Sequence, residues 1–172
     1  MITLEINMKA EITLNLRTRE VHKLFERKIR NDTLFIKAIL HRFNKIRSAC
    51  HQNADMNKPL LDNIEHQLLK GSQIFTLETN RFEQLLYKMP EFSQKKIDFI
   101  TQFHPSILIT NHQGALLVNF IDCYDKLVAT IKLLHLAGCF SSDSDYYFHI
   151  KNIQKTANKV LSTILVEPPK KS

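Results

Sequence analysis

The apolar positions of the chain change period within its first third. Between residues 9 and 17, apolar side chains alternate with polar ones, at Ile12, Leu14 and Leu16. This alternation predicts a strand with one buried face. From Arg19 to Asn31 the apolar residues recur at helical spacing instead, at Val21, Leu24, Phe25 and Ile29. A helix follows the strand directly, and Thr18 is its best N-cap.

A second helix is predicted from Leu34 onward. Asn31, Asp32 and Thr33 form a polar break before it, and Asp32 or Thr33 can cap it. Its apolar residues occupy more than one side: Leu34, Phe35, Ile36, Ala38, Ile39, Leu40, Phe43 and Ile46. Such a helix must be buried on several sides, which in a small N-terminal unit favours a second subunit.

The rest of the chain is predicted to be mainly helical. Polar residues 48–58 indicate a linker or helix break, Pro59 can open a helix, and helical spacing then continues to Pro90. Residues 106–110 have the pattern of a short strand. Gln113–Ala137 is the strongest helix, with Gly138 in the C′ position, and a final helix follows Ser141–Asp143. We therefore divide the chain into a unit at 1–50, a helical domain at 55–166 and a frayed tail at 167–172.

Composition agrees with a mainly α fold. Apolar residues make up 44% of the chain, and there are only 3 Gly and 5 Pro. The three cysteines are odd in number and form no CxxC pair, which favours reduced thiols in the cytoplasm. The longest apolar runs are far too short to span a membrane, and the N-terminus has no signal-peptide pattern. We expect a cytoplasmic protein that does not enter the membrane.

Charge is concentrated at the N-terminal end. Residues 1–50 hold 11 of the 24 Lys and Arg residues but only 5 of the 17 acidic residues, a net charge of +6. The remaining 122 residues carry a net charge of only +1. A basic strand-helix-helix unit is typical of a small nucleic-acid reader.

The polar face of the predicted strand carries side chains that can read DNA bases. Thr13, Asn15 and Arg17 alternate with the apolar set. Asn can pair bidentately with adenine, Arg with guanine, and Thr can bond a base edge or touch a thymine methyl. Two such strands, one from each subunit, would form an antiparallel ribbon that fits the major groove. The unit is too small to fold alone, so we expect a homodimer on double-stranded DNA.

Residues 13–17, with Arg19-Glu20-Val21 after them, resemble the strand and first-helix entry of the Arc repressor, a ribbon-helix-helix protein. The resemblance implies base reading by Thr13, Asn15 and Arg17. It also implies phosphate binding where the second helix starts, at Thr33 and Leu34, although the charge of Asp32 opposes a phosphate. Here the strand-to-helix junction is one residue shorter, and the turn lacks glycine. Arg19, Lys28 and Arg30 are further candidates for phosphate contacts.

A second resemblance covers about 150 residues at the level of pattern. Tyr87-Lys88-Met89-Pro90, the run from Asn111 to His135, Ala137-Gly138 and the closing helix are similar to the AcaB-type conjugation regulators of conjugative plasmids and integrating conjugative elements. The similarity implies a DNA-binding transcriptional activator of transfer genes with a ribbon-helix-helix element. It also leaves a protein partner possible for the C-terminal helical domain.

No pattern in the sequence indicates catalysis, a cofactor or a metal. Nucleotide-binding glycine loops, GxSxG and HExxH are absent. His135 and Cys139 lie one helical turn apart, but two ligands are too few for a metal. Asp122 and Asp125 are interpreted as an ordinary helix face near Lys126 and Lys132. We expect a protein that is not an enzyme.

Other interpretations of the N-terminal unit stay open. The alternating strand could be an ordinary edge strand, and the basic residues of the first helix could be a solvated face. A relaxosome accessory protein, which binds near a transfer origin, would use the same ribbon. A helical scaffold that binds a protein partner instead of DNA is the alternative of another class.

Overall fold

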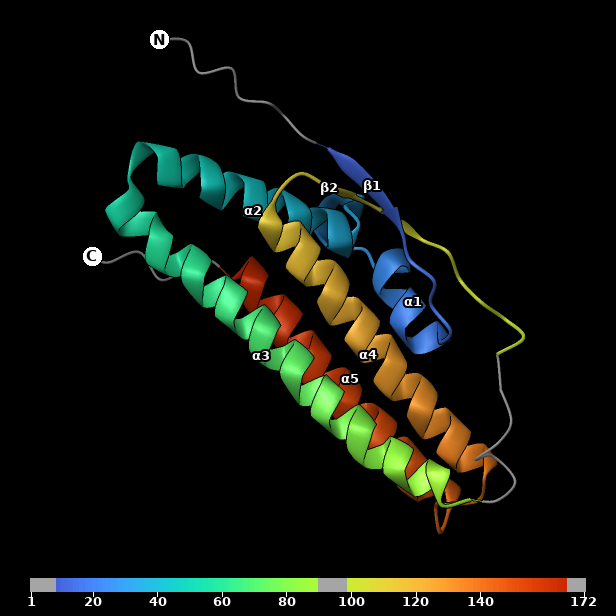
Figure 1. The fold of residues 1–172 in the computed structure, drawn as a ribbon. Helices are drawn as coiled ribbons and strands as arrows, with labels where there is room; N and C mark the ends of the chain where they lie inside the picture. Colours follow the sequence, from blue (N-terminus) through green and yellow to red (C-terminus); the bar gives the residue numbers. More distant parts are fainter. Residues whose placement is uncertain (1–8, 90–98, 167–172) are drawn as a thin grey trace.

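Three long helices lie side by side and form the body of the molecule (Figure 1). The computed structural model describes residues 9–89 and 99–166. The long helices are α3 (Ala54–Tyr87), α4 (His112–Leu136) and α5 (Asp143–Leu165). A fourth helix, α2 (Phe35–Gln52), crosses one end of them. The short helix α1 (Arg19–Glu26) and the strands β1 (Ala10–Thr13) and β2 (Ser106–Ile109) lie against α4. The predicted mainly helical fold is confirmed.

Helix α4 is the centre of the fold, because α1, α2, α3, α5 and β2 all pack against it. Its N-cap is Asn111, whose side chain accepts a hydrogen bond from the Gly114 amide at 2.9 Å. At the other end Gly138 has a positive φ of 76°, as a C′ glycine should. Both ends agree with the predicted helix to within one residue.

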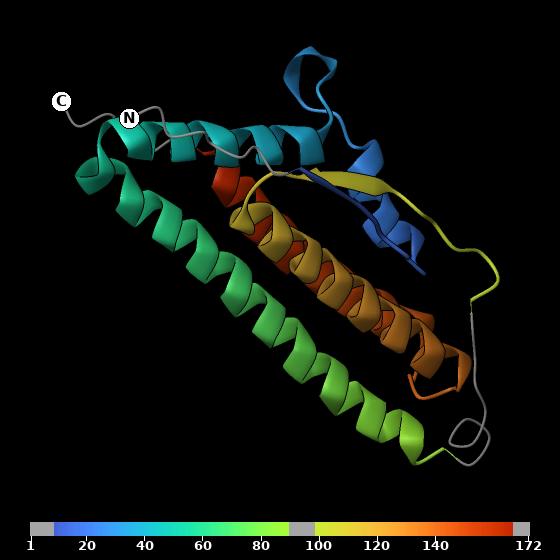
Figure 2. The ribbon, with the colours of Figure 1, turned by 45° about the horizontal axis from the view of Figure 1, so that its top comes forward.

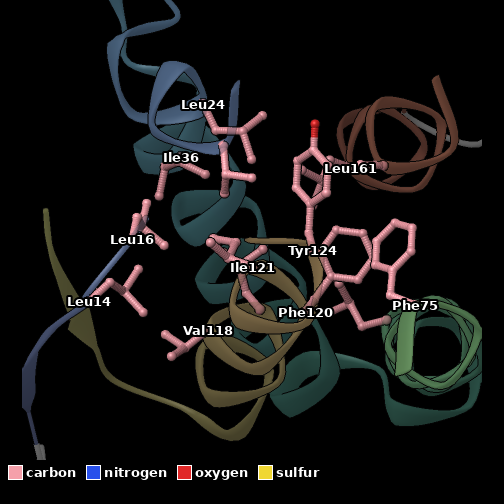
Figure 3. Close-up of a cluster of buried hydrophobic side chains, with 14 of the residues drawn as sticks. Leu14, Leu16, Leu24, Ile36, Phe75, Val118, Phe120, Ile121, Tyr124 and Leu161 are labelled. Carbon is pink, nitrogen blue, oxygen red and sulfur yellow. The ribbon is translucent and has the colours of Figure 1, made fainter. Parts of the chain in front are cut away.

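The hydrophobic core runs without interruption from β1 to α5. Figure 3 shows Leu14 and Leu16 on the same side of β1, facing Val118 and Ile121 of α4. Beyond α4 the core continues to Phe75 of α3 and to α5. Residues 1–50 therefore share their core with the later helices. The division of the chain into two units stays a prediction, and the predicted tail at 167–172 lies outside the described residues.

Two helix ends differ in detail from the predicted ones. The linker or helix break expected at 48–58 is a helix break at one residue, Asn53, which ends α2 and caps α3. The Asn53 side chain accepts a hydrogen bond from the Met56 amide at 3.3 Å, and Pro59 lies inside the helix rather than at its start. The first helix also ends early, at Glu26, because the chain turns back on itself between Arg27 and Phe35.

The apolar sides of α2 are covered by the chain itself. Its buried residues are Phe35, Ile36, Ile39, Phe43 and Ile46. They belong to the common core, and α2 packs against α1, α3, α4 and α5. The apolar faces of α2 therefore do not require a second subunit, and a dimer contact would have to lie elsewhere, at the sheet.

Candidate nucleic-acid interface

The strand predicted to read DNA pairs with a second strand of the same chain. β1 and β2 are antiparallel, with Ile12 opposite Ile107 and Thr13 opposite Ser106. Leu14, Leu16, Ile107 and Ile109 are buried, whereas Glu11, Thr13 and Asn15 are exposed on the opposite face. Leu108 of β2, opposite Glu11, is also on that outer face and is 52% exposed. The Thr13 hydroxyl lies 3.3 Å from that of Ser106. A two-stranded antiparallel ribbon whose outer face is polar except for Leu108 thus exists within one subunit.

The other edge of β1 is open within the described part of the chain. Leu14 and Leu16 donate their amide hydrogens to carbonyls of Pro105 and Phe103, both at 2.8 Å. In an antiparallel ladder, alternate residues point their backbone groups to opposite edges. The N–H and C=O groups of Glu11, Thr13 and Asn15 therefore point away from β2, and the described sheet has no third strand. This edge can accept another strand.

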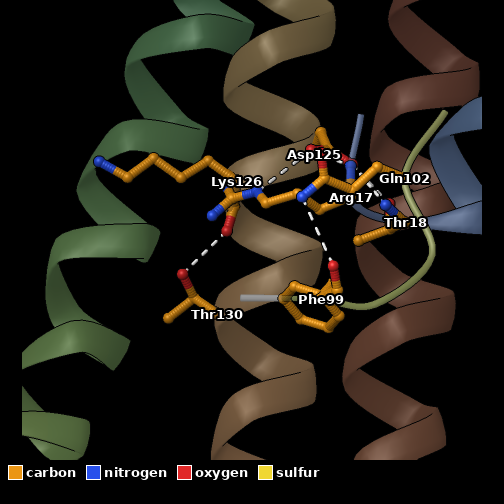
Figure 4. A network of polar contacts seen from close by, with 7 residues as sticks. All are labelled: Arg17, Thr18, Phe99, Gln102, Asp125, Lys126 and Thr130. Atoms are coloured by element: carbon orange, nitrogen blue, oxygen red, sulfur yellow. Dashed lines mark hydrogen bonds and ion pairs between the residues drawn. The ribbon is translucent and has the colours of Figure 1, made fainter. Parts of the chain in front are cut away.

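Arg17 lies differently from the other two predicted base readers. Its guanidinium is half-buried, and Nε lies 3.6 Å from a carboxylate oxygen of Asp125 on α4 (Figure 4). The same carboxylate accepts hydrogen bonds from the backbone amides of Arg17 and Thr18, each at 3.0 Å. It also accepts a hydrogen bond from the Thr18 hydroxyl at 2.7 Å. The structure therefore brings Thr13 and Asn15 together on the outer face and turns Arg17 toward the protein.

Asp125 is the polar residue that sequence reasoning missed. It was interpreted as part of a solvated helix face with Asp122, but it is buried, with only 3% of its surface exposed. A signal was present in the sequence: Asp125 follows Ile121 by four residues and precedes Val128 by three, both fully buried. This spacing puts a carboxylate on the apolar side of the helix. A buried carboxylate needs several donors, and Arg17 and Thr18, between β1 and α1, supply them.

The loop between α1 and α2 carries most of the predicted phosphate contacts. It projects from the body of the molecule (Figure 2). Two backbone hydrogen bonds close the base of the loop. The Ile29 amide donates to the Thr33 carbonyl, and the Phe35 amide donates to the Arg27 carbonyl, both at 2.8 Å. Lys28, Arg30 and Thr33 are exposed. The tip is tight, because Asn31 and Asp32 both have positive φ, and these residue types tolerate that conformation.

The start of α2 lies close to the ribbon. Leu34, its N-cap residue, is half-buried and makes no side-chain cap. The first amides of the helix therefore lack a side-chain partner at the cap. Leu34 and Lys37 line one groove with Glu11, Ser106 and Leu108 of the ribbon. Helix start, basic loop and ribbon thus occupy neighbouring surface.

Arg19 is the remaining predicted phosphate contact, and it is the first residue of α1. Its side chain is exposed and lines a cavity with Arg17 and Lys132. Arg19 therefore lies near the end of β1 and not on the projecting loop.

His135, one of the two residues considered as metal ligands, has an aromatic and an acidic neighbour. His135 stacks on Tyr146 at 4.1 Å, with its Nε2 atom 3.2 Å from Asp143. Burial raises the pKa of the Cys139 thiol. Among the described residues no three His, Cys, Asp or Glu side chains gather as metal ligands would, and no helix there is long and apolar enough to cross a membrane.

Comparison with known proteins finds similarity at the level of fold. No protein-family model matches the sequence, and no curated protein matches it. The structure resembles the crystal structure of AcaB from uropathogenic E. coli, with a TM-score of 0.65 and 16% sequence identity. The match covers 92% of this chain and 78% of the AcaB chain. The chain therefore has an AcaB-like fold, which confirms the coarse part of the resemblance seen in the sequence.

We predict that Asp125→Asn lowers the free energy of unfolding by about 2–4 kcal/mol, because it removes a buried charge that holds four donor groups. Urea unfolding at neutral pH measures the effect. Asp122→Asn on the same helix is the matched control. Burial, and then the charge of Asp125, raise the pKa of Asp122, so neutralising it should leave stability equal or slightly higher. Equal losses in both variants would contradict a special role for Asp125.

Proposed function

We propose that this protein is a sequence-specific DNA-binding transcriptional regulator that reads the major groove with the outer face of β1. The observation that carries the proposal is the exposed polar face of the ribbon, with Thr13 and Asn15 side by side along one strand. Side chains of this length and chemistry suit base edges, and a two-stranded ribbon fits the major groove. A regulator that reads DNA in this way needs no catalytic group.

Phosphate contacts would come from the basic surface beside the ribbon. Lys28 and Arg30 are exposed on a projecting loop. The start of α2 lines the same groove as the ribbon and can offer backbone amides to a phosphate. Such contacts set the register of the protein on the duplex, while the strand supplies sequence discrimination.

The DNA-binding form would be a homodimer joined through the open edge of β1. Two copies related by a twofold axis would place their β1 strands antiparallel at the centre of a four-stranded sheet, with the two β2 strands outside. This arrangement doubles the set of reading side chains and satisfies the backbone groups of Thr13 and Asn15. The resemblance of the sequence to AcaB-type conjugation regulators is the reason to expect that the target genes serve conjugative transfer, with activation as the regulatory effect.

We predict that Asn15→Ala relaxes specificity without loss of stability, since its side chain is exposed. Loss of one good side-chain contact to a base removes about 1–3 kcal/mol of discrimination against the wrong base. Selection from a duplex library at physiological salt measures it, with the exposed Asn80→Ala on α3 as control. An unchanged motif in Asn15→Ala would exclude this strand as the reader. Genomic sites at a transfer origin rather than at promoters would indicate a relaxosome accessory protein.

Lys28→Ala is expected to weaken binding to all duplexes alike. Loss of one phosphate contact should reduce the slope of log affinity against log salt by about 1. Lys155→Ala, an exposed lysine of α5, should leave the slope unchanged. Titrations at several salt concentrations measure both variants. A Lys28→Ala defect confined to one sequence would assign this lysine to base reading instead.

Thr13→Pro tests the dimer, because proline removes an amide that points to the open edge but breaks no backbone bond to β2. The hydroxyl contact with Ser106 is lost equally in Thr13→Pro and in Thr13→Ala. We expect Thr13→Pro to sediment as a folded monomer at concentrations where Thr13→Ala, which keeps the amide, sediments as a dimer. Sedimentation velocity and circular dichroism measure the two properties. A dimeric Thr13→Pro would place the subunit contact elsewhere.

A further inference from the structure

A cavity of about 780 Å³ opens beside the end of β1, away from the polar face of the ribbon. Its walls come from the start of α1, the last turns of α4 and the segment 99–103 that leads into β2. This volume falls within the range of ordinary small-molecule sites, about 300–1,000 Å³. The proposed function leaves this cavity without a role.

One side of the cavity is apolar and aromatic. The ring of His22 stacks on that of Phe103, with centroids 4.4 Å apart and planes within 16°. Phe99 and Leu133 continue this side, and Leu136, which is 71% exposed, stands at its rim. Apolar surface of this kind gains free energy when the hydrocarbon body of a ligand covers it.

Another part of the lining is basic. Lys132 pairs with Glu20 at 2.7 Å and Arg17 with Asp125 at 3.6 Å, so both of these charges have acidic partners. Arg19 is exposed and makes no ion pair within the described residues. The one acid that lines the cavity, Glu26, lies 3.4 Å from His22. Of the three basic residues that line the cavity, Arg19 is the one without an acidic partner among the described residues.

We propose that this cavity binds a small organic anion, in which a carboxylate, sulfonate or phosphate group is attached to an aromatic or aliphatic body. The anionic group pairs with Arg19, and the body lies against Phe103, Leu133 and Leu136. Guanidinium groups bind such anions through paired hydrogen bonds. A nucleic-acid backbone is a poorer fit, because it would leave the apolar side uncovered. The site stands independently of the proposed DNA binding.

Binding of 1-anilinonaphthalene-8-sulfonate to the full chain tests the apolar half of the site. We expect one saturable site per chain, seen as a rise in fluorescence. Leu136→Glu should weaken binding roughly tenfold or more, about 1.4 kcal/mol or more. The matched control is Leu77→Glu on α3, where the replaced leucine is 68% exposed but does not line the cavity. Equal affinities in the two variants would overturn the proposal.

The basic half is tested with Arg19→Gln and a pair of probes. The charged probe should bind this variant several-fold more weakly, about 1 kcal/mol in the free energy of binding. N-phenyl-1-naphthylamine, which has a similar body without the sulfonate, should bind it as it binds the parent chain. Equal effects on both probes, or none on either, would show that Arg19 does not recognise the anion. Competition by duplex DNA against the charged probe would assign the cavity to DNA instead.

Discussion

The carboxylate of Asp125 holds the end of β1 to the central helix, and the rest of the proposed interface depends on this contact. Three hydrogen bonds and one ion pair reach it from Arg17 and Thr18. Burying a charge is costly, and it is tolerated here because its donors come from adjacent residues of one strand end. Two of those donors are backbone amides, so the carboxylate fixes the path of the chain rather than one side chain. The direction of β1 and the start of α1 are set at the same point.

The contact between Asp125 and residues 17–18 changes how much charge the basic residues of the N-terminal segment can offer to a polyanion. The guanidinium of Arg17 balances Asp125, so much of its charge is compensated within the protein. Lys28 and Arg30, on the loop between α1 and α2, are exposed instead. The N-terminal charge excess seen in the sequence therefore consists of residues with different roles. Some of it holds the fold together, and the rest is available to a polyanion.

Local patterns in the sequence predicted the local structure well. The alternation at Ile12, Leu14 and Leu16, the N-cap position of Thr18 and the C′ position of Gly138 all depend on neighbours a few residues away. The break at Asn53 lies within the predicted range 48–58 but is shorter than that range, because one residue can end one helix and cap the next.

The remaining failures concern contacts between distant parts of the chain. The strand at 106–109 was predicted, but its pairing with β1 was not, since no local pattern reports a partner 93 residues away. The burial of Asp125 was missed for the same reason, because its donors lie more than 100 residues earlier. The candidate residues Thr13 and Asn15 could be named from sequence, whereas their setting in an intramolecular ribbon could not.

The separation of β1 from its partners also affects the order in which the protein forms. Asp125 lies 107 residues after Thr18, so a ribosome working at about 5–20 residues per second synthesises α4 roughly 5–20 s after the first strand. During that interval Leu14 and Leu16 have neither β2 nor α4 to cover them. Contacts of such long range also form slowly. A nascent chain that stops before β2 would display an unpaired apolar strand, the kind of segment that chaperones hold and that aggregates when they do not.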